Sequence, residues 1–293
     1  MKLKLGIPQG RLQAPVIDLF RHAGFEVRAN NGSYYPSVDD PDLECVLIRS
    51  EEIPCYTAEG IVDAGITGDD WIQEYESGTG TASLKIIENL LCPSLGLGHV
   101  RWVLAVPESS NIEKIRDLEG TTVSSELVEV TKRWLADHGV NARVVFSWGA
   151  TELKPPTLAA AIVQPETAET NLRQHKLRTV AEIMQSRPRL VCNRAVLHQE
   201  SPIREKLDQV RLLLNAAISA QGKVRLVIET NRGHRQDLEG LIEAVTPVMV
   251  VGDGDAITLN AIVQQTSVRD LIPRLKAAGA VRVIETSLNK FVL

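Results

Sequence analysis

The pattern of apolar and polar residues predicts an α/β protein. Leu3-Lys4-Leu5-Gly6-Ile7-Pro8 alternates like a strand, Gln9-Gly10-Arg11 follows as a turn, and residues 13–23 then show helical spacing. A second strand at 44–49 leads into a helix ending near residue 60 and a short apolar strand at 62–66. Repeated β-α units of this kind indicate a largely parallel sheet with helices on its faces.

The same pattern starts again after Gly98. It predicts strands at 101–107, 121–124 and 144–146, with a helix at 126–138 that stops at Gly139. We therefore expect two lobes, with residues 1–97 and about 186–214 in lobe I and residues 98–185 in lobe II. Ligands of such sheets bind beyond the carboxyl ends of the strands, so the cleft between the lobes is the expected site.

From about residue 210 the pattern changes. A helix is followed by a strand (224–228), a helix (237–244), two strands (248–251 and 256–263), a helix (268–278) and a strand (281–285). Without its leading helix this order is β-α-β-β-α-β, the ferredoxin-like arrangement. We expect a C-terminal domain over residues 215–293, although this topology serves many unrelated functions.

Composition narrows the classes of function. The 293 residues, 44% hydrophobic and 24% charged, suit two or three folded units. A net charge of -5 without a basic run argues against nucleic acid and favours a small-molecule partner. The four cysteines are scattered, which indicates neither a metal site nor a disulfide framework. No signal-like opening and no span of about 20 apolar residues is found, so we expect a cytoplasmic protein without a membrane segment.

Several longer motifs together resemble one family. They are Gly6-Ile7-Pro8-Gln9-Gly10, Ser33-Tyr34-Tyr35-Pro36-Ser37, the run from Gly60 to Trp71, Val100 to Pro107, Glu126-Leu127-Val128 with Val130-Thr131-Lys132, Ser147 to Glu152 with Lys154-Pro155-Pro156, Arg269 to Ala280 and Leu288-Asn289-Lys290. This sequence is similar to the long form of ATP phosphoribosyltransferase over nearly its whole length. The resemblance implies a two-lobed, periplasmic-binding-protein-like catalytic region and an ACT/PII-like C-terminal regulatory domain.

The resemblance also implies a reaction and its partners. The family joins N1 of the adenine of ATP to the anomeric carbon of phosphoribosyl pyrophosphate, the first step of histidine biosynthesis, with Mg²⁺ on the departing pyrophosphate. Carboxylates hold the ribose diol, and a Gly/Thr loop binds the 5′-phosphate through backbone N–H groups and hydroxyls. The resemblance further implies a homodimer or homohexamer, and histidine or another effector at the C-terminal domain.

The presumed phosphate loop departs from the family pattern. That pattern reads Asp-Ala-Ile-x-Asp, a branched apolar residue, two further residues, Ser or Thr, Gly, any residue, Thr and Leu. Here residues 160–172 read Ala-Ala-Ile-Val-Gln-Pro-Glu-Thr-Ala-Glu-Thr-Asn-Leu, so Ala160 and Gln164 stand at both acid positions. Glu169 replaces the glycine, which permits close backbone approach, and Pro165 removes a backbone donor. A carboxylate at 169 also repels phosphate, by about 1 kcal/mol at 4 Å in water.

Departures elsewhere have the same effect. Gln9 stands where long forms carry Lys, and the segment from Cys92 to His99 replaces one that holds Ser, Lys and Arg. Groups that favour an anionic phosphate are therefore missing from three segments. Misalignment of a variable loop is the alternative, but matching residues on both sides of the loop oppose it. The sequence does not separate decay of the site from a new use.

Candidate site residues follow from position and resemblance. We expect catalytic roles for Arg49, Asp69, Asp70 and Glu126, and ligand contacts from Gln9, Gly10, Arg11, Thr67, Gly68, Arg101, Glu152, Thr167, Thr170 and Asn171. Structural alternatives stand beside several of them. Asp69 and Asp70 could cap the following helix or complement its dipole, as could Glu126 and Glu152 at the ends of elements. Arg101 could be a solvated strand residue, and Tyr34 with Tyr35 could form a packed turn rather than flank an adenine.

Three hypotheses of function remain. The first is a long-form ATP phosphoribosyltransferase family member whose transfer activity is weak or altered. The second is a paralogue that acts on another adenosine-bearing substrate, such as ATP or S-adenosylmethionine, with different chemistry. The third is a ligand-sensing or assembly subunit without catalytic activity that acts through its C-terminal domain.

Overall fold

A computed structural model describes residues 1–29, 32–166, 172–198 and 200–292. The chain forms two compact units, one made of Met1–Arg21 with Phe25–Leu212 and the other of His22–Gly24 with Leu213–Leu293. The first unit holds two five-stranded sheets, and the second holds one four-stranded sheet. Among the described residues, no helix is both long and apolar enough to span a membrane.

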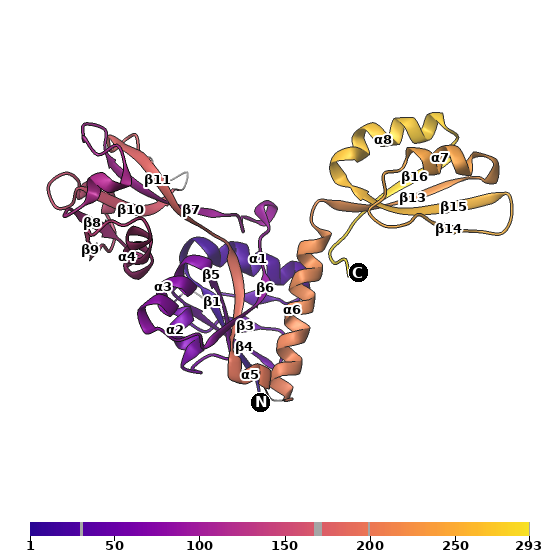
Figure 1. Ribbon diagram of the computed structural model, residues 1–293. Helices are drawn as coiled ribbons and strands as arrows, with labels where there is room; N and C mark the ends of the chain where they lie inside the picture. The colour runs from indigo at the N-terminus through magenta and orange to yellow at the C-terminus, as the bar shows by residue number, and fades with distance from the viewer. Residues whose placement is uncertain (30–31, 167–171, 199, 293) are drawn as a thin grey trace. The chain divides into compact units, whose positions relative to one another are not determined.

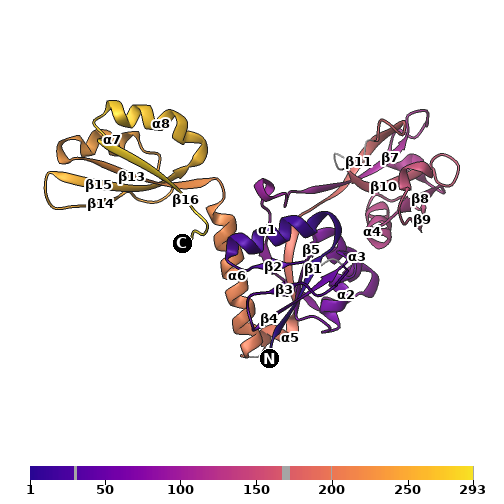
Figure 2. The same cartoon turned by 180° about the vertical axis from the view of Figure 1, so that it is seen from behind.

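Lobe I is a five-stranded sheet with helices on both faces (Figures 1 and 2). Its strand order is β4-β1-β5-β12-β6, in which β4, β1 and β5 are parallel and β12 runs antiparallel to both neighbours. Leu3 and Leu5 are fully buried, and Gly6 lies against Ile53 of α2. The strands are β1 (Leu3–Pro8), β4 (Leu43–Ile48), β5 (Ala64–Gly68), β6 (Leu84–Asn89) and β12 (Pro188–Asn193), and the short pair β2 (Val27–Arg28) and β3 (Ser37–Val38) lies apart. The helices of this lobe are α1 (Gln13–Ala23), α2 (Ile53–Ala58), α3 (Asp69–Thr79), α5 (Arg194–His198) and α6 (Pro202–Ala220), the last of which continues into the second unit.

Lobe II has its own sheet of order β11-β7-β10-β8-β9 and one long helix. Here β10, β8 and β9 are parallel, while β7 is antiparallel to both β10 and β11. Both sheets are therefore mixed, rather than largely parallel as the β-α pattern suggested. The elements are β7 (Val100–Pro107), β8 (Thr122–Ser125), α4 (Val128–Asp137), β9 (Arg143–Phe146), β10 (Ala161–Glu166) and β11 (Leu177–Ser186), with the 3₁₀ turns Pro93–Leu95, Ile115–Leu118 and Thr151–Leu153.

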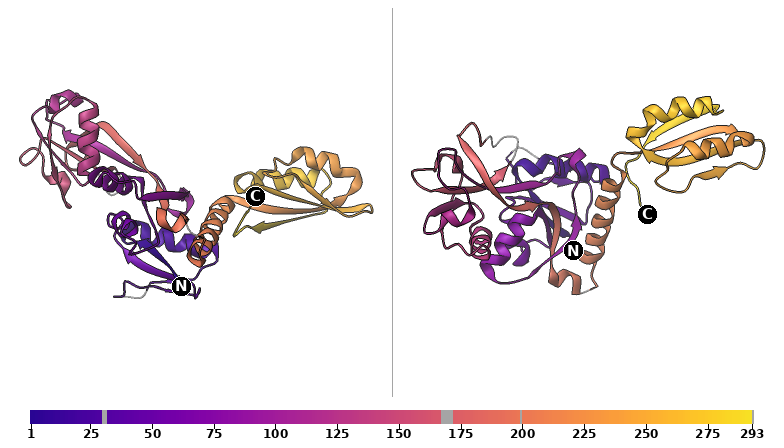
Figure 3. Two further views of the ribbon diagram at one scale, coloured as in Figure 1. Left: turned by 60° about the horizontal axis from the view of Figure 1, so that its bottom comes forward. Right: turned by 45° about the horizontal axis from the view of Figure 1, so that its top comes forward.

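The chain crosses between the lobes at two points. It leaves lobe I after β6 and enters lobe II at β7, and it returns where β11 ends at Ser186 and β12 begins at Pro188. Figure 3 shows both connections between the two sheets. Arg187 is the single residue between β11 and β12, so the return crossing is short. The expected two-lobed architecture is confirmed by these sheets and crossings.

The second unit has the expected β-α-β-β-α-β order. Its strands β13 (Lys223–Asn231), β14 (Met249–Val251), β15 (Ala256–Gln264) and β16 (Arg282–Ser287) form an antiparallel sheet of order β14-β15-β13-β16. Alternate residues such as Leu226, Ile228 and Leu259 are buried with Leu238 of α7 (Arg235–Leu241) and Leu275 of α8 (Gln265–Ala277). Both helices lie on one face of the sheet (Figure 1). The period-two burial of these strands explains why the sequence pattern located them well.

Candidate active site

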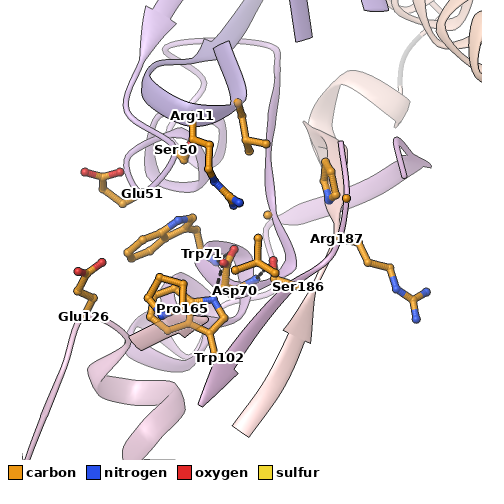
Figure 4. A pocket seen from close by; sticks show the side chains of 15 residues that line it. Arg11, Ser50, Glu51, Asp70, Trp71, Trp102, Glu126, Pro165, Ser186 and Arg187 are labelled. Atoms are coloured by element: carbon orange, nitrogen blue, oxygen red, sulfur yellow. Dashed lines mark hydrogen bonds between the residues drawn. The ribbon is translucent and has the colours of Figure 1, made fainter. Parts of the chain in front are cut away.

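A pocket of about 190 Å³ lies where the chain crosses between the two lobes. A cavity of this volume accommodates a ring-sized group, and it opens to solvent, so a larger ligand can extend out of it. Lobe I, lobe II and the return crossing all contribute to its walls (Figure 4). Its polar and aromatic lining consists of Arg11, Ser50, Glu51, Asp70, Trp71, Trp102, Glu126, Ser186 and Arg187, and Leu12, Gly68, Gly98, Val100, Pro165 and Pro188 complete the walls.

Asp70 forms the most tightly held corner of the pocket. It lies in the first turn of α3 and is 5% exposed. One carboxylate oxygen accepts the indole N–H of Trp102 at 2.7 Å, and the other accepts the backbone N–H of Trp71 at 2.9 Å. The Asp70 backbone N–H donates to the Ser186 hydroxyl at 3.1 Å. Burial is the largest influence and raises the pKa of Asp70, although these hydrogen bonds act in the opposite direction.

Gly68 is required by the close approach of that carboxylate. It ends β5 and precedes α3, and a Cβ atom placed on it would lie 2.0 Å from Oδ1 of Asp70 and 2.7 Å from the Ser186 hydroxyl. Such distances exclude any side chain at this position without displacement of Asp70 or Ser186. The sequence pattern ended this strand at Ile66, but all residues of Ala64–Gly68 are buried and β12 pairs as far as Gly68. The apolar pattern missed Thr67 and Gly68 because they are buried without being hydrophobic.

Glu126 lies on the lobe II side of the pocket. It lies between the end of β8 at Ser125 and the start of α4 at Val128. The helix predicted from the sequence began at Glu126 itself, two residues before α4 begins. Burial raises the pKa of Glu126, and the nearby carboxylates of Glu51, Asp70 and Glu152 raise it further. Lys154 acts in the opposite direction. The structure thus brings together several carboxylates around one half-buried side chain.

Two tryptophans join the lobes beside this pocket. Trp71 of α3 packs edge to face on Trp102 of β7, with ring centroids 6.1 Å apart. Nearby, both carboxylate oxygens of Glu74 in α3 accept the backbone N–H groups of Glu129 and Val130, each at 2.9 Å. These N–H groups belong to the first turn of α4 and have no partner within the helix. Lobe I therefore caps a helix of lobe II.

The other candidate residues of β5 and α3 have structural partners. Asp69 binds Arg189 of β12 through two hydrogen bonds of 2.6 and 3.1 Å and accepts the backbone N–H of Arg187 at 3.2 Å. Thr67 is fully buried, and its hydroxyl donates to the carbonyl of Ser50 at 2.7 Å. Both side chains support the pocket from outside its lining.

The presumed phosphate loop begins as a strand. Ala161–Glu166 is β10, which lies between β7 and β8 in the centre of its sheet. Gln164 is 3% exposed, and Pro165 lines the pocket beyond the point where pairing with β8 ends, so its missing N–H leaves that ladder intact. Thr167, Thr170 and Asn171, with Ala168 and Glu169, lie outside the described residues.

Arg101 is held by two acids next to this segment. Its guanidinium binds Glu166 of β10 at 2.5 Å and Glu182 of β11 at 2.7 Å. The hydrogen bond from Arg101 is the main reason that the pKa of Glu182 is lowered. A phosphate at this position would have to compete with both carboxylates for the arginine.

A second hollow of about 530 Å³ contains other candidates. Gln9 and Arg49 line it together with Tyr34, Tyr35 and Tyr56. Arg49 also lies over the indole of Trp148 in lobe II, 5.4 Å from the ring centroid, and 3.7 Å from Glu51. Tyr34 and Tyr35 are more than 60% exposed, so they do not form a tightly packed turn.

The structure therefore separates the predicted residues into groups. Arg11, Gly68, Asp70 and Glu126 meet in the interlobe pocket, whereas Gln9 and Arg49 lie in the tyrosine-lined hollow. Gly10 begins the 3₁₀ turn that carries Arg11 and has a positive φ of 80°. Glu152 lies in the 3₁₀ turn Thr151–Leu153 and acts on Glu126 through its charge.

Several lining residues were not predicted from the sequence. Ser50, Glu51, Ser186 and Arg187 were not singled out, and Trp71 and Trp102 entered only as parts of motifs. A polar Gln-Ser-Arg stretch before Pro188 was the available signal for the return crossing, because proline often marks the boundary of an element. Among the described residues, no group of three or more His, Cys, Asp or Glu side chains is placed to hold a metal ion.

Comparison with known proteins identifies the family. The family model for ATP phosphoribosyltransferase matches residues 49–216. The ATP phosphoribosyltransferase of Solibacter usitatus is 43% identical over 295 residues, covering all of both chains. That of Chlorobium chlorochromatii is also 43% identical, covering 99% of this chain and 97% of its own. This chain belongs to the ATP phosphoribosyltransferase family.

A solved structure of the family agrees with the fold. A chain of the ATP phosphoribosyl transferase complex from Thermotoga maritima superposes with a TM-score of 0.59 at 25% identity. The match covers 73% of this chain and 98% of the Thermotoga chain. The family resemblance inferred from the motifs is thus confirmed, and full coverage of the Solibacter and Chlorobium proteins agrees with the long form.

Proposed function

We propose that this chain transfers a phosphoribosyl group to N1 of the adenine of ATP, with low affinity for phosphoribosyl pyrophosphate. The observation that carries the proposal is 43% identity to an ATP phosphoribosyltransferase over the full length of both chains. The interlobe pocket supports it, because the pocket offers a ring-sized cavity with an indole surface, a cation and three buried or half-buried acids.

The pocket residues suggest a division of roles. Figure 4 shows the guanidinium of Arg11 directed into the pocket and that of Arg187 directed away from it. We assign phosphate binding to Arg11, and alignment of the lobe I wall to Gly68 and Asp70. The indole of Trp71 offers a surface on which an adenine ring can stack.

The phosphoribosyl half of the site is weakened. Ala160 and Gln164 offer no carboxylate to the ribose diol, and Arg101 is bound by Glu166 and Glu182. Magnesium would neutralise charge on the departing pyrophosphate, but the described residues contain no set of three protein ligands for it. We therefore propose that any Mg²⁺ arrives with the substrate, and we assign it no protein ligand.

A direct assay tests the proposal. The protein is incubated with ATP, phosphoribosyl pyrophosphate and Mg²⁺, and phosphoribosyl-ATP is identified by mass. We expect slow product formation that Arg11→Ala reduces by at least tenfold, since a charge-assisted contact to phosphate is worth about 1.5–3 kcal/mol. Arg21→Ala is the matched control, because Arg21 is exposed on α1 and pairs with Asp18. No product at saturating substrates would contradict the proposal.

The second hypothesis, a different reaction on an adenosine-bearing substrate, has one specific observation in its favour. The acid positions of the diol-binding pattern carry Ala160 and Gln164, and Gln164 is buried within β10. Calorimetry with ATP, phosphoribosyl pyrophosphate, S-adenosylmethionine and histidine separates the hypotheses. Binding of adenosine ligands without phosphoribosyl pyrophosphate favours the repurposed enzyme, and binding of histidine alone favours the sensing subunit.

We also propose a homodimer or homohexamer, with histidine or another effector bound at the C-terminal domain. The full-length matches to relatives extend over this domain. Sedimentation at micromolar concentration gives the assembly mass, and a strictly monomeric mass would contradict the first part. Calorimetry of the full chain with histidine tests the second.

A further inference from the structure

Glu126 is a half-buried carboxylate that lines the interlobe pocket. Asp70 accepts hydrogen bonds on both oxygens, and Glu51 lies 3.7 Å from the guanidinium of Arg49. For Glu126, no hydrogen bond or ion pair is formed within the described part of the chain. The Lys154 ammonium, whose charge acts on it, donates to the Ser147 hydroxyl instead. The pocket therefore keeps one half-buried acid available.

The surroundings of Glu126 favour a positive charge in the pocket. The carboxylates of Glu51, Asp70 and Glu152 all act on Glu126. In Figure 4 the carboxylates of Glu51 and Glu126 lie beyond the same end of the Trp71 indole, one above it and the other below it in that view. An indole face attracts cations, and carboxylates in a partly water-excluded site do so more strongly than in water.

The reaction produces a positive charge on the adenine ring. As the N1 lone pair forms a bond to the anomeric carbon, the bond from that carbon to pyrophosphate breaks, and its electron pair leaves with pyrophosphate. The adenine ring system therefore gains one positive charge, and the departing pyrophosphate gains one negative charge. Groups aimed at a charge that develops during the reaction stabilise the transition state more than the substrate.

We propose that Glu126 is a catalytic residue that stabilises the positive charge developing on adenine, while Trp71 provides the surface on which the ring stacks. This inference rests on the proposed function, because it places adenine in the interlobe pocket. The cavity of about 190 Å³ suits a ring-sized group, and both residues line it. The remainder of the nucleotide extends out of the cavity.

Stable analogues test the inference without turnover. 1-Methyladenosine, at a pH at which its base is protonated, carries the charge, while adenosine lacks it and N6-methyladenosine adds a methyl group without charge. By calorimetry, 1-methyladenosine should bind the parent about five- to tenfold more tightly than either neutral nucleoside, the effect of a partly solvated ion pair together with a cation–π contact. Equal affinities for all three would overturn the inference, and this comparison needs no variant.

Matched variants assign the preference to Glu126. Glu126→Gln should reduce it to about twofold or less, and Glu126→Asp should retain part of it because the charge remains. Glu129→Gln is the control, since Glu129 lies three residues further on and pairs with Lys132 at the surface. An unchanged preference in a folded Glu126→Gln protein would overturn the assignment.

The outcome also separates this inference from the proposed function. A preference for 1-methyladenosine without phosphoribosyl-ATP formation supports the cation site and contradicts the transfer reaction. Phosphoribosyl-ATP formation without the preference supports the reaction and overturns the role of Glu126.

Discussion

Two parts of the site differ in how strongly the fold depends on them. One is the lobe I corner, formed by Gly68 and Asp70, and the other is the β10 side, which contains Ala160 and Gln164. Asp70 is buried, and its bonds to Trp102 and Ser186 connect α3 to β7 and β11. At the β10 side, Ala160 and Gln164 stand where the family pattern has acids, and the neighbouring Glu166 binds Arg101. A side chain that serves both packing and ligand binding is costly to replace. A side chain that serves only the ligand can change while the fold survives.

The largest expected effect breaks the lobe I corner. Gly68→Ala should lower the free energy of unfolding by about 3 kcal/mol, because the new Cβ would lie 2.0 Å from the Asp70 carboxylate. Urea denaturation measures the loss. Gly78→Ala in α3, the helix that follows Gly68, is the control, since its Cβ would meet Glu129 at an ordinary 3.5 Å and alanine favours helix. Similar losses for both variants would show that the corner is not specially constrained.

Rebuilding the β10 side sharpens the comparison. We expect the combined variant Ala160→Asp, Gln164→Asp, Ala168→Thr, Glu169→Gly and Asn171→Thr to bind phosphoribosyl pyrophosphate about thirtyfold more tightly. Loss of the Glu169 charge and access to backbone N–H groups contribute about 1 kcal/mol each. Each single change should do little, because the groups act together. Calorimetry with Mg²⁺ decides, and unchanged affinity in the combined variant would exclude these positions as the cause of weak binding.

A smaller loss of stability is expected when the lobe II partner of Asp70 is changed. Trp102→Phe removes the indole N–H that donates to Asp70 at 2.7 Å and should lower the free energy of unfolding by about 1.5 kcal/mol. Trp134→Phe is the matched control, because its indole N–H forms no hydrogen bond within the described residues and its ring stacks on His138. Urea denaturation of both variants gives the difference, which should be close to zero if the Asp70 bond contributes nothing.

The smallest effect concerns pH. Because the pKa of Glu126 is raised above its ordinary 4.5, the folded chain holds this proton more tightly than the unfolded chain. Stability from this group is therefore present below that value and is lost as pH rises through the folded pKa. Glu126→Gln should be more stable than the parent near pH 7, by less than about 1 kcal/mol, and equal to it near pH 4. A stability difference that grows on acidification would reverse the assigned sign.

Much of the fold could be predicted from local sequence pattern. The C-terminal strands alternate strictly, as in Val224, Leu226 and Ile228, so their burial follows from period two. The two connections between the lobes could not be predicted in this way. β11 and β12 follow each other with one residue between them, yet they belong to different sheets, because β11 pairs with β7 and β12 with β5 and β6. Such long-range pairing leaves little local signal.

The candidate site was predictable only in part. The helix start after Gly68 pointed to Asp70, but its bond to Trp102, thirty-two positions later, depends on how the lobes meet. Arg101 could not be distinguished from a free cation, since its partners Glu166 and Glu182 lie on two other strands. Arg49 follows a strand in the sequence as Asp69 does, yet it lines the tyrosine hollow because β4 is the edge strand of its sheet.

Because Glu74 of lobe I binds the first turn of α4 in lobe II, amide exchange in that turn depends on opening of the cleft. Its carboxylate accepts the backbone N–H groups of Glu129 and Val130 from across the lobes. Lobe separation would expose these two amides to solvent while the later turns of α4 keep their internal bonds. Amide hydrogen exchange at Glu129 and Val130, compared with that at Leu135, therefore measures how often the cleft opens to admit or release a ligand.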